Sequence, residues 1–135
     1  MNDFNRRIIE EFRANAGKVG GPFEGANLLL LHTTGAKTGQ HRVNPTAYRR
    51  DGDRLVIMAS KGGAPTNPDW FHNVRANPAA TVEVDDEQFD VVATITEADE
   101  RERLWADTKR VMPQFGDYEQ KTDRQIPVIV LERVA

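Results

Sequence analysis

The sequence predicts a mainly β, α+β fold in which an antiparallel sheet or small barrel carries helices on its outside. Short apolar segments are separated by hairpin-type turns such as Asp51-Gly52-Asp53 and Asp85-Asp86-Glu87. Helical periodicity is confined to a few segments, and strands and helices do not alternate regularly. Because hairpins join antiparallel strands, we do not expect the parallel sheet of a dinucleotide-binding fold.

The first helix is expected over residues 3–15, with one apolar face. The residues of that face are Phe4, Ile8, Ile9 and Phe12. The face either covers the barrel core or docks on a membrane surface. Glycines and Pro22 follow the helix. We therefore divide the single domain into a helix with a flexible connection over residues 1–24 and a barrel over residues 25–135.

Six strands and two more helices are expected in the barrel region. The strands span residues 27–34, 42–50, 55–60, 81–84, 89–96 and 126–133. Pro45 is expected to interrupt the ladder of the second strand, because proline lacks an N–H donor. Asn67 is expected to cap a helix that begins at Pro68, and the last helix is expected to end near Val111.

The charge of the chain is unevenly distributed. The net charge is −3, but residues 32–61 carry six Lys and Arg against two Asp. The overall acidity argues against nucleic-acid binding, whereas a local basic segment suits a small anionic ligand. Three of the basic residues, Arg49, Arg50 and Arg54, are expected to lie on a solvated strand face.

Several classes of protein are not expected. The absence of cysteine excludes a disulfide scaffold, a thiolate metal site and a cysteine nucleophile. His32, His41 and His72 lack the spacing of a metal-binding helix motif, so no metal is expected. The longest apolar run, residues 28–31, is far shorter than the ~20 residues that span a bilayer. We expect a soluble cytoplasmic protein, with peripheral membrane contact through the first helix as the open alternative.

Two glycine-rich turns follow the first and third expected strands. They are Gly35-Ala36-Lys37-Thr38-Gly39 and Ala59-Ser60-Lys61-Gly62-Gly63. In the first turn, backbone amides with Lys37 and Arg42 can bind an anion. In the second, Ser60 can donate to a flat ring and Lys61 can contact a phosphate. Because the turns flank consecutive antiparallel strands, they can meet at one end of the sheet, although each is also compatible with an ordinary connection.

Two aromatic residues are further candidates. Trp70 lies either over a cofactor or in the core, and the Tyr118 phenol either donates a proton to a substrate or lies on the surface. No catalytic triad or carboxylate pair stands out. A chain with so few acid, base and nucleophile signals suits an enzyme whose cofactor performs the chemistry.

Several of these motifs, in order, resemble the deazaflavin-dependent nitroreductase family of actinobacteria. The matching segments are Thr33-Thr34-Gly35-x-Lys37-Thr38-Gly39, Arg42-Val43-Asn44-Pro45, Ala59-Ser60-Lys61-Gly62-Gly63, Asn67-Pro68-x-Trp70-Phe71-x-Asn73 and Thr122-Asp123-Arg124-x-Ile126-Pro127. The resemblance extends over nearly the whole chain from about Gly25 onward. It implies a split β-barrel of antiparallel strands with flanking helices, and the deazaflavin coenzyme F420.

The resemblance also implies a set of site residues. Those that would hold the coenzyme's phosphate and acidic tail are Ala36, Lys37, Thr38, Arg42, Val43, Asn44, Pro45, Thr46 and Ala47. Those that would contact the ring are Met58, Ala59, Ser60 and Lys61, and those that would close the pocket are Asp69, Trp70, Phe71, His72 and Asn73. Ser60 would orient the ring, and Tyr118 would position or protonate the acceptor.

The implied activity is hydride transfer from reduced F420 to a quinone or nitroaromatic acceptor. Nitroimidazole-reducing members carry further aromatic residues near Phe115 and Lys121, where this chain has a ring without a hydroxyl and a lysine. This difference argues against nitroimidazole reduction. Two alternatives remain open: an FMN-dependent oxidoreductase on the same barrel, and a non-catalytic carrier of F420.

Overall fold

A computed structural model describes residues 3–20 and 27–134 of the 135-residue chain. Its helices are α1 (Asp3–Ala14), η2 (a 3-10 turn, Lys61–Gly63), α2 (Asp69–Ala76), α3 (Ala98–Val111) and α4 (Gln114–Gln120). Its strands are β1 (Leu28–Thr34), β2 (His41–Asp51), β3 (Arg54–Met58), β4 (Ala79–Val84), β5 (Glu87–Ile95) and β6 (Val128–Arg133). The expected glycine connection and the boundary at residue 24 lie largely outside the described residues.

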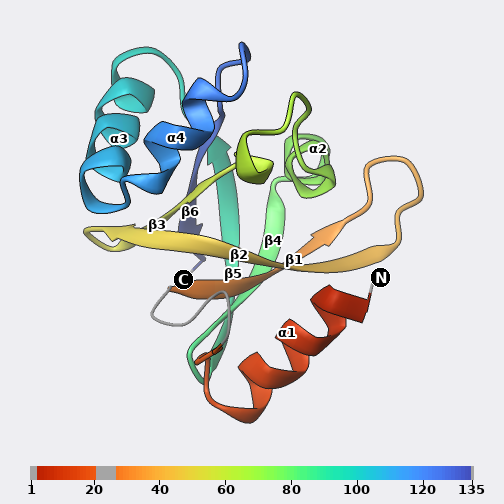
Figure 1. The fold of residues 1–135 in the computed structure, drawn as a ribbon. Coiled ribbons are helices and arrows are strands. Elements are labelled where there is room, and N and C mark those ends of the chain that lie inside the picture. Colours follow the sequence, from red (N-terminus) through yellow and green to blue (C-terminus); the bar gives the residue numbers. More distant parts are fainter. Residues whose placement is uncertain (1–2, 21–26, 135) are drawn as a thin grey trace.

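The six strands close into one antiparallel barrel in the order β1-β2-β3-β6-β5-β4. Every neighbouring pair in this order is antiparallel, including the closing pair β1 and β4. Figure 1 shows α1 on one side of the barrel, α3 and α4 on the other, and α2 beside the β1–β2 hairpin. The predicted antiparallel barrel with external helices is confirmed.

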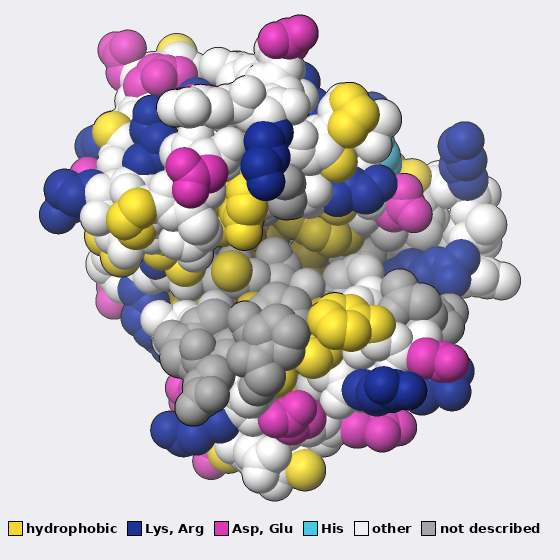
Figure 2. Space-filling view, viewed as in Figure 1, with side chains coloured by type: hydrophobic (Ala, Val, Ile, Leu, Met, Phe, Trp, Pro, Cys, Tyr) yellow, Lys and Arg dark blue, Asp and Glu magenta, His cyan; other side chains and the backbone are white. Residues whose placement is uncertain are grey.

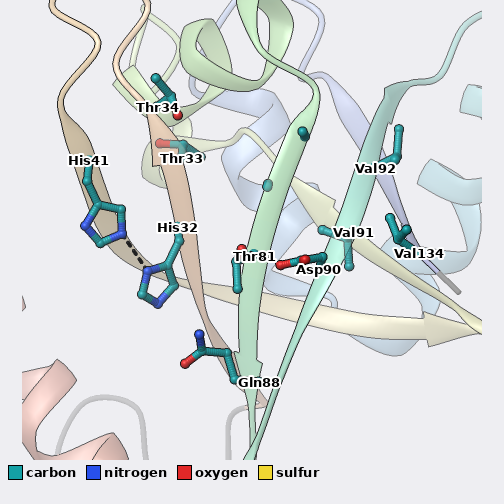
Figure 3. Close-up of a pocket in the computed structure, with 12 residues that line it drawn as sticks. His32, Thr33, Thr34, His41, Thr81, Gln88, Asp90, Val91, Val92 and Val134 are labelled. Atoms are coloured by element: carbon teal, nitrogen blue, oxygen red, sulfur yellow. Dashed lines mark hydrogen bonds between the residues drawn. The ribbon is translucent and has the colours of Figure 1, made fainter.

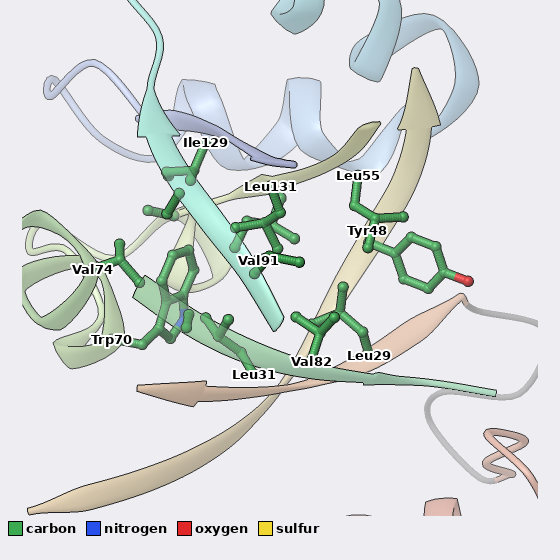
Figure 4. Close-up of a cluster of buried hydrophobic side chains, with 14 of the residues drawn as sticks. Leu29, Leu31, Tyr48, Leu55, Trp70, Val74, Val82, Val91, Ile129 and Leu131 are labelled. Carbon is green, nitrogen blue, oxygen red and sulfur yellow. The ribbon is translucent and has the colours of Figure 1, made fainter. Parts of the chain in front are cut away.

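The apolar run in β1 is buried on both faces of the barrel wall. Leu29 and Leu31 point into the barrel, where they meet residues of all the other strands (Figure 4). Leu28 and Leu30 point outward and pack against α1. A strand covered on both sides needs no polar alternation, which explains four consecutive leucines.

The apolar face of α1 covers the barrel. Ile8, Ile9 and Phe12 are 6%, 5% and 1% exposed, whereas Phe4, one turn earlier, is 52% exposed. Most of this face is therefore used by the fold itself. Among the described residues, no helix is both long and apolar enough to cross a bilayer.

Strands β2 and β3 differ greatly in length, and this leaves part of β2 with one free edge, meaning an edge that no described strand pairs. β2 pairs with β1 along residues 41–47, but it pairs with β3 only over Tyr48–Asp51. The backbone N–H of Tyr48 faces β1, where it donates to the Asn27 carbonyl. Because backbone groups alternate along a strand, the nitrogen of Pro45 faces the free edge. Pro45 lies opposite Leu30 and does not interrupt the ladder, contrary to the sequence expectation.

Two expectations about the helical segments were wrong. Helix α4 was not predicted, because Gly116 breaks a short apolar pattern whose buried member is Phe115. Asn67 does not cap α2, since the residue at the cap position is Pro68 and the Asn67 side chain accepts a hydrogen bond from Arg124 instead.

Arg49 is buried, so the expectation that it lies on a solvated face was wrong. It is 9% exposed, and it donates to the Thr108 hydroxyl (2.8 Å) and the Leu104 carbonyl (2.7 Å) of α3. Burial lowers the pKa of its guanidinium. Arg50 is exposed, and Arg54 is partly buried in an ion pair with Asp51. Arg49 thus attaches α3 to the barrel.

We expect Arg49→Ala to lower the free energy of unfolding by about 2 kcal/mol, because it removes two buried hydrogen bonds from a charged donor. Urea unfolding of the variant measures this value. Arg50→Ala, the same substitution at the exposed neighbouring residue, is the control and should cost under about 1 kcal/mol. Equal losses in the two variants would contradict the anchoring role of Arg49.

Candidate functional site

The β1–β2 turn is closed by its own backbone and attached to α2 by one asparagine. Gly35 N–H donates to the Gln40 carbonyl (2.7 Å), and a Cβ on Gly35 would lie 2.7 Å from the Thr38 hydroxyl oxygen, so a side chain at Gly35 would displace Thr38. The Asn73 amide accepts from Ala36 N–H (2.9 Å) and donates to the Thr33 hydroxyl (3.0 Å). Asn73 is 7% exposed, so this link is sheltered from water.

A pocket of ≈ 720 Å³ lies between this turn, α2 and the start of α1. Its lining residues are Asn5, Gly35, Ala36, Lys37, Thr38, His41, Arg42, Val43, Asn44, Asp69, His72 and Asn73. Figure 2 shows this face hollowed between the α2 side and the α1 side, with hydrophobic side chains on the floor and Lys and Arg side chains toward the hairpin.

Lys37 and Arg42, the two Lys and Arg residues of the pocket, have no anionic partner in the described part of the chain. Across residues 3–20 and 27–134, neither Lys37 nor Arg42 forms an ion pair or a side-chain hydrogen bond. The pocket also contains one carboxylate, Asp69, on α2. Unpaired cations beside the amides of a tight turn form a site for an anionic group.

The second glycine-rich loop is held by Arg124, whose guanidinium binds three acceptors. It donates to the carbonyls of Ser60 (2.8 Å) and Ala64 (2.9 Å) and to the Asn67 side chain (2.6 Å). Burial lowers the pKa of Arg124. One partly buried side chain therefore fixes the path of the chain from the end of β3 to the start of α2.

The same loop packs against α4. Gly63 has a φ of +85°, and a Cβ there would lie 2.8 Å from the Tyr118 carbonyl oxygen, so glycine permits the close approach. The Tyr118 ring contacts Phe115 edge to face, and the Lys121 ammonium lies 5.9 Å from the Tyr118 ring centroid. Tyr118 therefore lies beside the loop that carries Ser60 and Lys61.

Comparison with known proteins identifies the family of the chain. The model of the F420H(2)-dependent quinone reductase family matches residues 4–133. The chain belongs to this family. An F420H(2)-dependent quinone reductase of Mycobacterium tuberculosis is 41% identical over 126 residues, which cover 90% of this chain and 85% of that protein.

Solved structures agree with this placement. A structure of an F420-H2 dependent reductase is 38% identical, with a TM-score of 0.71 over 78% of this chain and 94% of that one. A structure described as a domain-swapped dimer is 35% identical, with a TM-score of 0.73 over 94% and 93% of the two chains. The heme storage protein HutZ of Vibrio cholerae, at 16% identity and a TM-score of 0.61, shares the fold alone.

The pocket of this quinone reductase family member contains nine of the expected coenzyme-binding residues. These are Ala36, Lys37, Thr38, Arg42, Val43, Asn44, Asp69, His72 and Asn73. Pro45, Thr46 and Ala47 continue the same strand along its free edge. Their contact with a coenzyme remains a prediction, which the position of the pocket supports.

The residues expected at the ring are arranged differently. Ala59, Trp70 and Phe71 belong to the barrel core, and Met58 packs under α3 and α4, with exposures of 0%, 6%, 6% and 4%. These side chains do not line the pocket, so any ring contact from them remains a prediction. Ser60 is 8% exposed, and its hydroxyl has no hydrogen-bond partner among the described residues.

Sequence reasoning missed three residues that build the site. His41 and Asn5 line the pocket, and Arg124 holds the second loop. Arg124 lies in a motif that matched the family, but the motif alone does not show what its guanidinium binds. The signal for His41 was its place beside Arg42 at the start of β2.

We expect Arg124→Ala to lower the free energy of unfolding by about 2–3 kcal/mol, because three hydrogen bonds from one charged group are lost. Hydrogen exchange at the Gly63 and Ala64 amides should become faster, since their loop loses its support. Asp123→Ala, at an exposed neighbour, is the control. If exchange in the loop is the same in both variants, Arg124 does not hold it.

Proposed function

We propose that this protein binds coenzyme F420 along the free edge of β2 and transfers hydride from its reduced form to a quinone. The observation that carries the proposal is the pocket at the β1–β2 turn, where Lys37 and Arg42 have no anionic partner among the described residues. A chain of this family needs a binding site for an anionic coenzyme, and this pocket supplies the missing charge.

The length of the site supports a long ligand. From Ala47, the residue before the paired segment with β3, to His41 the strand advances by six residue steps, or about 20 Å at roughly 3.3 Å per residue. Lys37 and the turn lie at one end of this edge, and Ser60 and Lys61 lie at the other. An elongated coenzyme with a ring at one end and an acidic tail at the other fits this separation.

The residues of the chain have distinct roles in the proposal. When bound, reduced F420 supplies the hydride. Lys37 and Arg42 bind the phosphate and acidic tail, and the Ser60 hydroxyl, which has no other partner in the described part, orients the ring. Tyr118, next to the Ser60–Gly63 loop, donates a hydrogen bond or a proton to the acceptor oxygen.

A quinone is favoured over a nitroaromatic acceptor by the family to which the chain belongs, and the residues around Tyr118 are compatible with it. Phe115 is 4% exposed between Trp105 and Tyr118, so its ring belongs to the core. Lys121 places an ammonium beside the Tyr118 ring. The acceptor side therefore offers a phenol and a cation, which suit an acceptor whose oxygens gain negative charge on reduction, as those of a quinone do.

The direct test mixes the purified protein with reduced F420 and menadione and follows oxidation of the coenzyme. We expect oxidation above the uncatalysed rate and no comparable activity with reduced FMN. Tyr118→Phe should lower kcat by about 10²-fold, the usual contribution of a proton donor, with coenzyme affinity unchanged. Tyr48→Phe, at the buried core tyrosine, is the control. Failure to bind F420 and to oxidise it would refute the proposal, and binding without turnover would identify a carrier.

Lys37→Ala should weaken F420 binding by about fivefold, or roughly 1 kcal/mol, measured by quenching of coenzyme fluorescence. This loss of binding free energy is smaller than that expected for a buried charged hydrogen bond, because Lys37 is exposed. Arg50→Ala removes the same charge at the far end of β2 and should leave the affinity unchanged. An equal loss in both variants would mean that Lys37 acts only through the net charge.

A further inference from the structure

Two histidines at the base of the β1–β2 hairpin form a direct hydrogen bond. His32 Nδ1 and His41 Nε2 are 2.7 Å apart, and the rings are stacked with their centroids 4.9 Å apart. Figure 3 shows the two side chains pointing toward each other from neighbouring strands. Nitrogen atoms at this separation share one hydrogen, so one histidine donates and the other accepts.

The pair is continued by a carboxylate and an arginine. His32 Nε2 is 2.6 Å from Glu83 on β4, and Glu83 accepts two hydrogen bonds from Arg13 on α1 (3.1 and 2.8 Å). The bond from Arg13 is the main cause of a lowered pKa at Glu83, so this group is a carboxylate at neutral pH. An ionised Glu83 only accepts, and His32 therefore donates to it through Nε2–H.

This arrangement determines where a proton can bind. With Nε2–H of His32 directed at Glu83, a neutral His32 accepts from His41 through Nδ1. His41 then keeps Nδ1 for solvent or for a ligand, and one added proton makes the pair a cation next to a carboxylate. A second proton would place two N–H groups against each other across 2.7 Å. The pair therefore takes up one proton and excludes a second.

His41 lies where this charge can act on the coenzyme. It lines the ≈ 720 Å³ pocket together with Lys37 and Arg42, and it also lines a second cavity of ≈ 700 Å³ over β1, β4 and β5. The other titratable or charged side chains lining these two cavities are His32, Asp69, His72 and Asp90. Among the described residues, no three His, Asp or Glu side chains are placed to hold a metal ion, so the pair is not part of such a cluster.

We propose that His41 is a third cationic contact for the acidic tail of the coenzyme, and that coenzyme binding takes up one proton at the His32–His41 pair. The proposal rests on the proposed function, because it assigns the residue to the same site. An anion beside Lys37 and Arg42 favours the charged form of His41. By linkage, affinity for the tail then rises as pH falls and the pair gains its proton.

The test compares F420 with its deazaflavin–ribitol fragment, which has the same ring but neither phosphate nor acidic tail. Dissociation constants of both are measured by fluorescence at pH 6 and pH 8, and their ratio cancels any ionisation of the ring. We expect the advantage of the full coenzyme to be about threefold to fivefold larger at pH 6, the size of one exposed charge contact. Calorimetry at pH 7 in buffers of different ionisation enthalpy should show proton uptake with F420.

Three substitutions test which residue takes up the proton when the coenzyme binds. His41→Gln should remove both the pH dependence of the ratio and the proton uptake. Glu83→Gln should reduce them, because the carboxylate that favours the cation is gone. His72→Gln removes the other histidine of the pocket and should leave the pH dependence in place. Circular dichroism confirms that each variant is folded, which is expected since His41 and His72 are exposed.

The possible failures are distinguishable. If F420 does not bind at either pH, the proposed function fails and this proposal fails with it. If F420 binds but the ratio is independent of pH, or if His41→Gln keeps the wild-type dependence, the coenzyme assignment stands and the role of His41 is overturned. If His72→Gln loses the pH dependence, the proton binds at His72 and not at the His32–His41 pair, which would also overturn the proposal.

Discussion

The unequal lengths of β2 and β3 are the constraint on which the candidate site depends. The barrel closes through β3, β6 and β5, but β3 pairs only with Tyr48–Asp51 of β2 and leaves residues 41–47 with one edge that no described strand pairs. The β1–β2 hairpin therefore projects past the end of β3, and helix α2 packs beside the projecting part. Had β3 been as long as β2, backbone pairing would fill the edge along which we place the coenzyme. The free edge also explains why Pro45 is tolerated, since its missing N–H faces no strand.

Two side chains support the projecting hairpin and the loop after β3, one at each end of the unpaired part of β2. Asn73 attaches the hairpin turn to α2, and Arg124 attaches the Ser60–Asn67 loop to the segment that precedes β6. Both act through several hydrogen bonds from a shielded position, where water competes poorly. Asn73 lines the pocket as well as supporting the turn, and the Ser60 carbonyl accepts from Arg124. The Lys37 side chain and the Ser60 hydroxyl are not used in these links, so variants of these two groups can test binding separately from support.

Sequence reasoning predicted the antiparallel barrel, because apolar alternation and turn residues are local signals. Strand ends differed by one or two residues, as at β3, which ends at Met58 and not at Ser60. Features that depend on tertiary partners could not be predicted from the sequence. The local sequence suggests that Arg49 is a surface residue, because it does not show that α3 covers it. It likewise suggests that Asn67 caps a helix, because it does not show that Arg124 binds the Asn67 side chain. The His32–His41 pair required the register of β1 and β2, which places Thr34 opposite His41 and brings the two rings together across the strands.

The fold alone would not have assigned a function. A heme storage protein shares the fold at 16% identity, so the fold by itself does not specify a ligand. The features that point to an anionic coenzyme lie in the hairpin and the loop after β3: cations without partners, a free backbone edge and a serine hydroxyl with no partner among the described residues. Without a ligand, Lys37 and Arg42 are exposed to solvent, whereas the Ser60 hydroxyl is shielded and has no partner among the described residues. The gathering of these groups along one edge of the barrel is best explained by a ligand that binds them.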